Sequence, residues 1–371
     1  MPGAGATAGA AIGDPGPEPP PDRPRDRTAW QLRVQALACA NMGSPLYAHL
    51  LDRAADDCVA GGVTWEVLSG HADAGRADAL ALRLLAAVHR LVLQGRAPRL
   101  AAFYPSVGGS PERNGVEDAF AATLAANAEE LSRLVERPCQ TNEVGRSAAL
   151  MVGFIAVRAR TGLPLRLLEV GASAGLNLRC DHFRIGGGGR AIGDPGSPVD
   201  LSGYWKVPPP EVPDRIAVAS RRGCDRDPVD PTTAEGRLAL TSSVWADQRD
   251  RLDRLEGAIE LARRHPAPVD LASLDEWTER QVRTLPEGCA TVVFHSVVSE
   301  YLPEHVRDRF VAALSDAAAR ATTGRPLAWV RLEPVSALRH HGLEVTVWPG
   351  GDSRVLARCG AHGTDVEWLE G

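Results

Sequence analysis

The sequence of 371 residues contains a single lysine, Lys206, although lysine and arginine together number 41. The phosphate-binding motif GxxxxGK[ST] is absent, which argues against a P-loop NTPase. A Schiff base with pyridoxal phosphate could form only at Lys206, so enzymes of that class are disfavoured. The formal net charge of −6 argues against a nucleic-acid partner, because such proteins neutralise the phosphate backbone with basic residues.

Cysteine and histidine patterns typical of disulfides or metal sites are missing as well. The seven cysteines are widely spaced without a CxxC pair, HExxH is absent, and His340 and His341 are adjacent rather than four residues apart. This cysteine usage is typical of small buried thiols in a reducing cytoplasm. We therefore expect free thiols and no metal site.

Long hydrophobic runs are absent too. The longest nearly apolar segment, Ala148–Val157, has about half the length of a membrane span. Residues 1–27 are mostly Gly, Pro, Ala, Asp and Arg and lack the apolar run of a secretory signal. We predict a disordered tail over residues 1–27, a cytoplasmic protein and no membrane partner, whereas the sequence does not indicate the oligomeric state.

The pattern divides the rest of the chain into two predicted domains. Residues 28–160 have apolar residues at helical spacing, most clearly in Ala79–Leu93 and Ser147–Arg160, and predict an all-helical N-terminal domain. In residues 161–371, short β-rich runs alternate with helical segments, which is typical of a parallel sheet flanked by helices. Residues 184–215, rich in Gly and Pro, interrupt this alternation as an inserted loop.

The second domain has five predicted parallel strands and a final hairpin. The strands are Leu165–Val170, Ile216–Ser220, Pro268–Leu271, Ala290–His295 and Leu327–Leu332. The helices are Gly175–Asp181, Thr233–Arg264, Leu274–Leu285 and Pro303–Ala321. Leu343–Trp348 and Arg354–Cys359 flank a Pro-Gly-Gly-Asp turn and predict an antiparallel hairpin. This α/β fold, a mostly parallel sheet with a C-terminal antiparallel hairpin, resembles the Rossmann-like sheet of class I methyltransferases.

The sharpest local motif is LLEVGASAGL at Leu167–Leu176, an apolar strand followed by a small-residue turn and a helix. Small residues let a ligand approach the backbone, and a helix N-terminus offers free N–H groups. The spacing E-x-G-x-S-x-G resembles the S-adenosylmethionine loop of class I methyltransferases. The resemblance places Glu169 near the cationic end of the cofactor, Gly171 and Gly175 under it, and Ala172 and Ser173 in the loop.

Other interpretations of this motif stay open. Ser173 stands where those methyltransferases usually have glycine, and a tight strand-to-helix turn can be purely structural. The same residues also spell the G-x-S-x-G nucleophile elbow of α/β-hydrolases, with Ser173 as the nucleophile and His340 or His341 as a partner. The helical upstream region opposes a hydrolase, because that fold needs several strands and an oxyanion loop before the elbow.

Two further acids follow the second and third predicted strands. Asp225, in GCDRDP, matches a turn in which an acid binds ribose hydroxyls, and Asp270 is placed to meet an adenine amino group. Both are expected to bind the cofactor, although either could equally be a solvated loop acid.

The polar segment QTNEVGR at Gln140–Arg146 precedes the last predicted N-terminal helix. It could simply cap that helix through Thr141 or Asn142. Alternatively, because the helix before the first strand commonly crosses the cofactor pocket in methyltransferases, Gln140, Asn142 and Arg146 are expected to bind substrate. Glu143 is then a candidate catalytic base.

His295 ends the fourth predicted strand, at the sheet edge where ligands bind in parallel α/β folds. A histidine titrating near neutrality can accept a proton from a group being methylated, so His295 is the second candidate base. A hydrogen bond to a neighbouring carbonyl would instead make it structural. Glu300 and Tyr301 follow in the next loop and are expected to bind substrate.

Several segments resemble a bacterial family known as domain-of-unknown-function family 2332. They are QTNEVGRSAAL at Gln140–Leu150, LLEVGASAGLNL at Leu167–Leu178, GSPLYAHLL at Gly43–Leu51, LVLQGRAPRLAAFYP at Leu91–Pro105, GDPGSPV at Gly193–Val199 and VVFHSVVSEYLP at Val292–Pro303. The resemblance runs from about residue 30 to the end. It implies the two-part architecture and brings no established reaction.

The expected function is S-adenosylmethionine-dependent methyl transfer to a small molecule or a peptide, with His295 or Glu143 as the base. Other uses of the same cofactor are not excluded. A serine hydrolase at Ser173 and a non-catalytic nucleotide-binding or assembly module are the alternatives, because a fold does not fix an activity.

Overall fold

The computed structural model describes residues 23–75, 78–111, 114–335 and 340–369. The chain forms two compact units, Met1–Cys139 with Ser242–Arg249, and Gln140–Thr241 with Asp250–Gly371. The division after Cys139 differs from the predicted one after residue 160, and Ser242–Arg249 joins the first unit from far along the chain. Most of the predicted tail, residues 1–22, lies outside the described residues, and its end forms the first turn of a helix that starts at Pro24.

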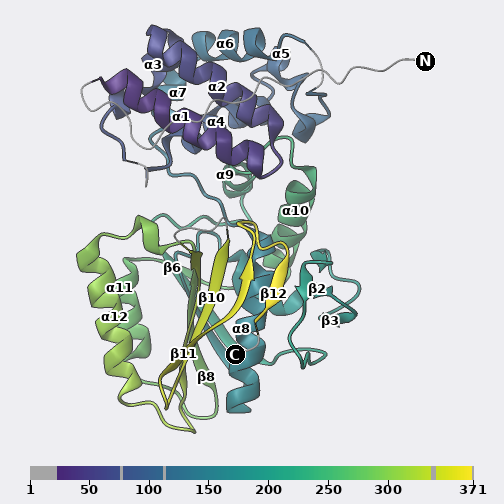
Figure 1. Cartoon of the computed structure of the whole chain (residues 1–371), viewed down its shortest axis with the longest axis vertical. Coiled ribbons are helices and arrows are strands. Elements are labelled where there is room, and N and C mark those ends of the chain that lie inside the picture. The colour runs from purple at the N-terminus through teal and green to yellow at the C-terminus, as the bar shows by residue number, and fades with distance from the viewer. Residues whose placement is uncertain (1–22, 76–77, 112–113, 336–339, 370–371) are drawn as a thin grey trace. The chain divides into compact units, whose positions relative to one another are not determined.

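The first unit is built of helices, and its described residues contain no strand (Figure 1). The helices are α1 (Pro24–Asn41), α2 (Pro45–Ala60), α3 (Val63–Leu68), α4 (Leu80–Leu93), α5 (Pro98–Ala101), α6 (Val116–Ala126) and α7 (Ala128–Leu134), with short 3₁₀ turns η1 (Ser69–His71) and η3 (Pro105–Val107). Helix α4 matches the predicted amphipathic run, and it buries Leu84, Val88 and Leu91 completely. A helical core therefore forms without contributions from a sheet.

Ser242–Arg249 is held in this helical unit by both apolar and polar contacts. Trp245 and Ala246 belong to its buried core. The Asp247 carboxylate accepts hydrogen bonds from Ser44 Oγ at 2.6 Å and from the backbone N–H of Leu46 at 3.1 Å, at the start of α2. The predicted single helix Thr233–Arg264 is consequently two helices, α9 (Ala234–Ser243) and α10 (Arg249–Arg264).

The second unit is organised around a nine-stranded sheet in the order β5-β12-β11-β10-β9-β8-β1-β6-β7. Its strands are β1 (Leu165–Val170), β5 (Trp205–Val207), β6 (Val218–Asp225), β7 (Val269–Leu271), β8 (Ala290–Ser296), β9 (Leu327–Pro334), β10 (His341–Trp348), β11 (Asp352–Cys359) and β12 (Val366–Trp368). The pairings from β7 through β9 are all parallel, and β9, β10, β11 and β12 pair antiparallel in succession. The sheet is thus mostly parallel, in an α/β unit.

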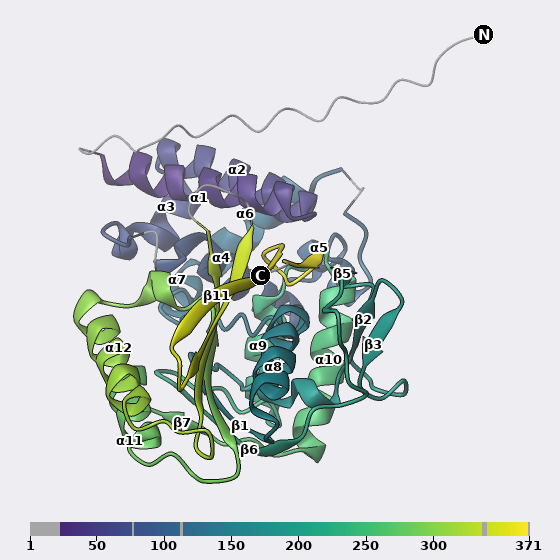
Figure 2. The ribbon, with the colours of Figure 1, turned by 60° about the horizontal axis from the view of Figure 1, so that its bottom comes forward.

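Helices cover both faces of this sheet (Figures 1 and 2). On one face, α11 (Leu274–Val282) and α12 (Glu304–Ala318) bury a core that includes Leu168, Val170 and Val293. On the other face, α8 (Ser147–Thr161) packs against β8 to β12, and the rings of Phe154 and Phe294 meet edge to face at 5.1 Å. The helical segments η4 (Val144–Arg146), η5 (Leu176–His182) and η6 (Ser299–Tyr301) are short 3₁₀ turns.

The predicted inserted loop at 184–215 contains strands instead. A small sheet has the order β3-β2-β4, from β2 (Arg184–Gly187), β3 (Arg190–Ile192) and β4 (Asp200–Ser202), and β5 adds an edge strand to the main sheet. The sequence did not indicate these strands within the predicted inserted loop, because they have only three or four residues each, too few to show a period.

All seven cysteines lie in the described ranges and are free thiols, six of them buried and Cys139 half-buried. Across residues 23–75, 78–111, 114–335 and 340–369, no helix has the length and apolar character that crossing a membrane would need. The same residues contain no group of three or more His, Cys, Asp or Glu side chains positioned to hold a metal ion.

Candidate functional site

The candidate site lies at the carboxyl ends of β1 and β8. The chain passes from β1 to β6 on one side and from β8 to β9 on the other, so the strand order reverses between β1 and β8. In open parallel sheets, ligands bind in the crevice outside the strand ends at such a point. The expected loop after β1 and the expected histidine at the end of β8 therefore lie on neighbouring, paired strands.

Both loops that follow these strands hold a non-glycine residue with positive φ, Ser173 at 52° and Val297 at 56°. Only four described non-glycine residues have this conformation, and for a β-branched residue such as Val297 it is strongly disfavoured. Strained residues of this kind persist where the surroundings hold them, and they cluster at functional sites. The backbone strain thus points to the same crevice as the topology.

The two glycines of the β1 loop meet protein side chains where the sequence interpretation expected a ligand. A Cβ atom on Gly171 would lie 2.6 Å from Val298 Cγ2, and one on Gly175 would lie 2.8 Å from Val269 Cγ2. Both glycines also have positive φ, 66° and 64°. Glycine is needed here for the turn and for close packing against the loop after β8 and the first residue of β7.

The helix after this loop offers fewer free N–H groups to a ligand than predicted. It is the seven-residue 3₁₀ segment η5, not an α-helix, and Asn142 Oδ1 already accepts the N–H of its first residue, Leu176, at 2.9 Å. Ala172 is buried, and its N–H donates to Cys224 O at 3.0 Å. The backbone of the loop is therefore fixed by the protein itself.

Asp225 lies at the end of β6, and the structure brings it to the β1 loop as expected. Its Oδ2 accepts the N–H of Ser173 at 2.7 Å, and its Oδ1 accepts the N–H of Asp227 at 2.9 Å. Asp270 on β7 is engaged elsewhere: Arg222 binds both of its oxygens at 2.6 and 2.7 Å, and Trp277 Nε1 donates at 2.7 Å. The hydrogen bond from Arg222 lowers the pKa of Asp270.

Glu169 is an acid with an unusual environment. It is only 2% exposed, and its Oε2 atom is buried without a hydrogen-bond partner. Burial raises the pKa of Glu169 well above its ordinary value, and the neighbouring Asp225 adds to this rise, while Arg179 and Asn177 act in the opposite direction. The surroundings thus favour the neutral acid, whereas the predicted role beside a cation requires the carboxylate.

The segment Gln140–Arg146 wraps around the β1 loop. Ser173 Oγ donates to Gln140 Oε1 at 2.5 Å, and Gln140 Nε2 donates to the carbonyl of Asp227 at 2.9 Å. Arg146 Nε donates to Ala361 O at 3.0 Å, and its Nη1 reaches Ser296 O at 3.5 Å at the end of β8. The two sequence motifs therefore contact each other. Their hydrogen bonds join backbone groups or the Ser173 hydroxyl to the side chains of Gln140, Asn142 and Arg146.

Glu143 forms a buried ion pair that the sequence did not reveal. Its Oε2 accepts from Arg251 Nε at 2.7 Å and Nη2 at 2.6 Å, and its Oε1 accepts the N–H of Gly145 at 3.1 Å, which caps η4. Burial alone would raise the pKa of Glu143, but Arg251, His362 and Arg146 outweigh it and hold the pKa at about 2. A carboxylate with this pKa is a weak base, so the ion pair with Arg251 disfavours Glu143 as the catalytic base.

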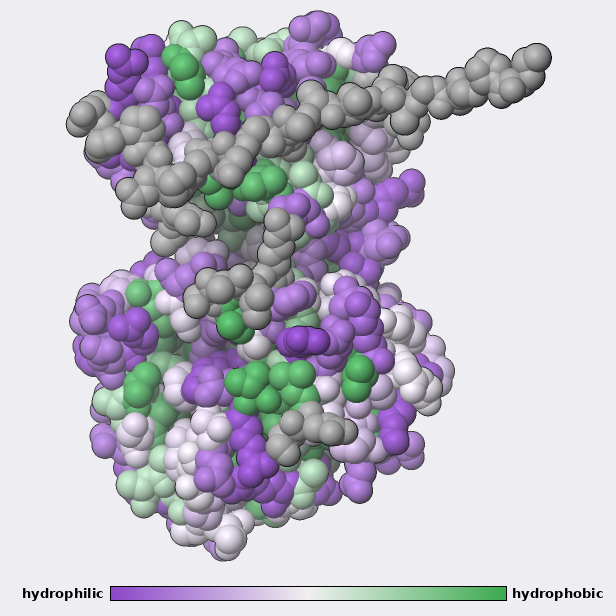
Figure 3. Space-filling model, viewed as in Figure 1, coloured by the Kyte–Doolittle hydropathy of each residue, from purple (hydrophilic) through white to green (hydrophobic). Residues whose placement is uncertain are grey.

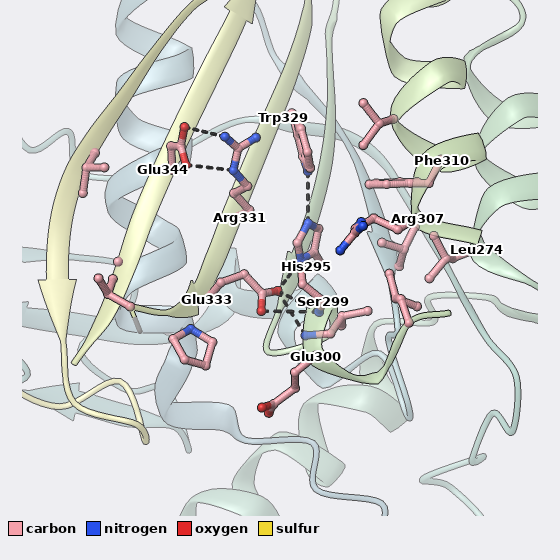
Figure 4. A pocket seen from close by; sticks show the side chains of 18 residues that line it. Leu274, His295, Ser299, Glu300, Arg307, Phe310, Trp329, Arg331, Glu333 and Glu344 are labelled. Atoms are coloured by element: carbon pink, nitrogen blue, oxygen red, sulfur yellow. Dashed lines mark hydrogen bonds and ion pairs between the residues drawn. The ribbon is translucent and has the colours of Figure 1, made fainter. Parts of the chain in front are cut away.

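His295 is buried at the end of β8, with both ring nitrogens hydrogen-bonded (Figure 4). Nδ1 lies 2.6 Å from Glu333 Oε1, and Trp329 Nε1 donates to Nε2 at 3.1 Å. Because Nε2 accepts, the ring is neutral with its proton on Nδ1. Glu333 also accepts the N–H groups of Val298 at 3.0 Å and Ser299 at 3.4 Å, so it ties the histidine to the loop after β8.

A pocket of about 820 Å³ opens beside this histidine. Its walls are the end of β8 with the following loop, β9, parts of β10 and β11, and the first half of α12. Of the predicted residues, His295 and Glu300 line it, while Tyr301 is 44% exposed and does not. The predicted cofactor residues do not line it either, although Val170 and Val298, which flank the β1 loop, do.

The structure adds four residues that sequence reasoning missed: Glu333, Trp329, Arg251 and Arg307. Glu333 stands near the end of β9, so the strand-end signal that identified Glu169 and Asp225 could have found it. The others lack such a signal. Ser173 Oγ, in turn, donates to an amide oxygen rather than facing a histidine ring, and His341 lies buried on β10.

Comparison with models of known protein families gives a match. The model of a family described as "Uncharacterized protein conserved in bacteria (DUF2332)" matches residues 29–368. Neither the curated proteins nor the solved structures provide a match to this chain.

Proposed function

Since the chain belongs to the DUF2332 family of bacterial proteins, whose description gives no activity, we propose a function from the geometry of the second unit. We propose that it is an S-adenosylmethionine-dependent methyltransferase that acts on a small molecule or a peptide. The proposed cofactor site lies at the carboxyl ends of β1 and β6, next to the reversal of strand order between β1 and β8, and the proposed acceptor site is the pocket beside His295.

The strand order supports this proposal. Counted along the chain, β1, β6, β7, β8 and β9 are the first to fifth main parallel strands, and their spatial order is third, second, first, fourth, fifth. This is the beginning of the Rossmann order, in which a nucleotide binds at the ends of the first two strands. The antiparallel strands β10 and β11 then extend the sheet, as in the predicted methyltransferase-like fold.

The observation that carries the proposal is the contact between Asp225 and the β1 loop. In Rossmann folds, an acid at the end of the second strand binds a ribose hydroxyl beside the loop after the first strand. Each Asp225 oxygen accepts one backbone N–H and keeps a lone pair for a further donor. Glu169 supplies a second buried oxygen without a partner, two residues before Gly171. Asp225 fits an adenosine group, and a cation bound beside Glu169 would lower the pKa that burial raises and so favour the carboxylate.

S-adenosylmethionine, when bound, supplies a methyl group on a positively charged sulfur. The chain supplies the base, and His295 is the better of the two predicted candidates. Glu333 accepts a hydrogen bond from Nδ1–H and orients the ring, as the third group of a catalytic triad does. The Nε2 lone pair is covered by the Trp329 N–H, so an acceptor hydroxyl or amine must replace that contact before His295 can take its proton.

A serine hydrolase is the second candidate, and one observation favours it. Ser173 adopts φ of 52° in a turn directly after a buried strand, as the nucleophile of a G-x-S-x-G elbow does. The hydroxyl, however, donates to Gln140 and not to a histidine. Labelling of Ser173 by a fluorophosphonate would favour this candidate over the methyltransferase.

The test of the proposed function is the shift in melting temperature caused by S-adenosylhomocysteine in Asp225→Ala and in a control, Asp253→Ala. Asp253 is an exposed acid on α10. Ligand that binds only the folded state raises its apparent stability. We expect the wild type and the control to shift equally and Asp225→Ala to shift much less, at a ligand concentration near the wild-type dissociation constant. Equal shifts in all three proteins would contradict the assignment of Asp225, and no shift in the wild type would contradict the cofactor.

A further inference from the structure

One charged side chain of the pocket, Arg307, has only long ion pairs with exposed acids. Arg307, in the first turn of α12, approaches Glu304 at 3.7 Å and Asp308 at 3.8 Å, and these acids have side chains 82% and 68% exposed. Both distances exceed those of a hydrogen bond. In Figure 4 the Arg307 guanidinium points toward the His295 ring, into the pocket. Its charge is therefore available to a ligand.

Apart from Glu300, the other charged groups of the pocket are already paired. Arg331 binds Glu344 at 2.9 Å and lies over the Trp329 ring, 4.0 Å from its centroid. The Glu333 carboxylate holds His295 and two backbone N–H groups. Glu300 carries the remaining negative charge, and in Figure 4 its carboxylate points away from this cluster. Among the described residues that line the pocket, Arg307 is thus the cation with the longest and most exposed ion pairs.

The walls around Arg307 are apolar. Phe310 and Trp329 meet edge to face with ring centroids 5.7 Å apart. Val311, Val335 and Val355 line the same pocket although they are 38%, 48% and 50% exposed. Figure 3 shows apolar residues interrupting the polar surface of the second unit on this face. Grouped apolar residues at a surface concavity are typical of a ligand site.

We infer that this pocket binds a small molecule with an apolar ring and a carboxylate. The carboxylate pairs with Arg307, whose planar guanidinium matches its geometry, and the ring packs against Phe310 and Trp329. The volume of about 820 Å³ lies within the range of pockets for small molecules. The inference that the pocket binds such an acid is independent of the proposed function. The further claim that the bound acid is the methyl acceptor rests on the proposed function.

The experiment compares two probes of the same ring and size by isothermal titration, without S-adenosylmethionine. Naphthalene-2-carboxylate has the negative charge, and naphthalene-2-carboxamide lacks it. The proteins are the wild type, Arg307→Gln, Arg307→Lys and Arg354→Gln, the last being an exposed arginine on β11 that does not line the pocket. Arg307 is half exposed, so its replacement leaves the core intact.

We expect the wild type to bind the carboxylate at least tenfold more tightly than the carboxamide, because a charge-assisted hydrogen bond is lost with the amide. Arg307→Gln should remove this preference, Arg307→Lys should keep part of it, and Arg354→Gln should leave it unchanged. Equal binding of the two probes by the wild type, unchanged affinity in Arg307→Gln, or no saturable binding of the carboxylate would each overturn the inference. Because no cofactor is present, these results are independent of whether the proposed function fails.

Discussion

Glu169→Gln perturbs a single ionisable group in the interior of the second unit. Glutamine has the shape of the neutral acid and keeps an oxygen for the hydrogen bond with Asn177. Burial raises the pKa of Glu169 in the folded protein, whereas the unfolded chain has the ordinary value of about 4.3. Between these two values the folded state holds more protons, so rising pH lowers the free energy of unfolding. Glu169→Gln has no ionisable group at this position, so its free energy of unfolding does not fall with pH for this reason.

The size of the effect follows from the shift. Each unit by which the folded pKa exceeds the unfolded one costs the wild type about 1.4 kcal/mol at pH above both values. For a domain of this size, 1 kcal/mol corresponds to roughly 2–4 °C in melting temperature. Glu169→Gln should therefore melt several degrees above the wild type at pH 8, and the gap should shrink toward pH 4, below which both carry a neutral side chain.

The assay is thermal unfolding of both proteins in a pH series, with Glu367→Gln as the control because Glu367 lies on β12, far along the sheet from β1, and pairs with Arg358 near the surface. The difference in melting temperature between Glu169→Gln and the wild type isolates Glu169 from other titrating groups. A difference that stays constant from pH 4 to 8, or a variant less stable than the wild type at pH 8, would refute the reasoning.

Two further substitutions test the interlocked motifs. Glu143→Gln leaves Arg251 buried without its carboxylate and should cost about 3–5 kcal/mol at pH 7 in chemical unfolding. Because the folded pKa of Glu143 is lowered to about 2, its contribution to the free energy of unfolding is present above about pH 4.3 and lost as pH falls toward 2. The difference in stability between the wild type and Glu143→Gln should therefore narrow at low pH. A cost below about 1 kcal/mol at pH 7 would indicate that Glu143 only caps a helix. Ser173→Ala removes the hydrogen bond to Gln140 and should cost about 1 kcal/mol in the same assay while leaving ligand-induced stabilisation intact. Complete loss of a measured hydrolytic activity in Ser173→Ala would instead support the nucleophile elbow.

The main sheet could be predicted because its strands carry a local signal. Leu165–Val170 and Ala290–Ser296 are buried on both faces and read as continuous apolar runs, and β10 and β11 flank glycine-rich turn residues. The division of Thr233–Arg264 carries no such signal. Its interruption contains neither glycine nor proline, and it arises because Trp245 and Ala246 are buried in the helical unit. Tertiary contacts there override helical periodicity.

The candidate site was predictable in its strand-end residues and in the segment Gln140–Arg146, which contacts the β1 loop. Acids and a histidine after apolar runs located Glu169, Asp225 and His295 at one sheet edge. Their partners were not predictable, because Glu333 follows His295 by 38 residues and Arg251 follows Glu143 by 108. Pairings over such distances depend on the strand order and on the helices that cover it. The sequence could therefore propose His295 as a base without showing that Trp329 covers its free nitrogen.

The most direct test of the central claim is a calorimetric titration of the wild type with S-adenosylhomocysteine, followed by the same titration of Asp225→Ala. The account predicts saturable binding with one site per chain, weakened about tenfold or more in the variant, because a carboxylate that binds a ribose hydroxyl contributes a charged hydrogen bond. Absence of binding to a folded wild-type protein would contradict the account, and so would an affinity that Asp225→Ala leaves unchanged.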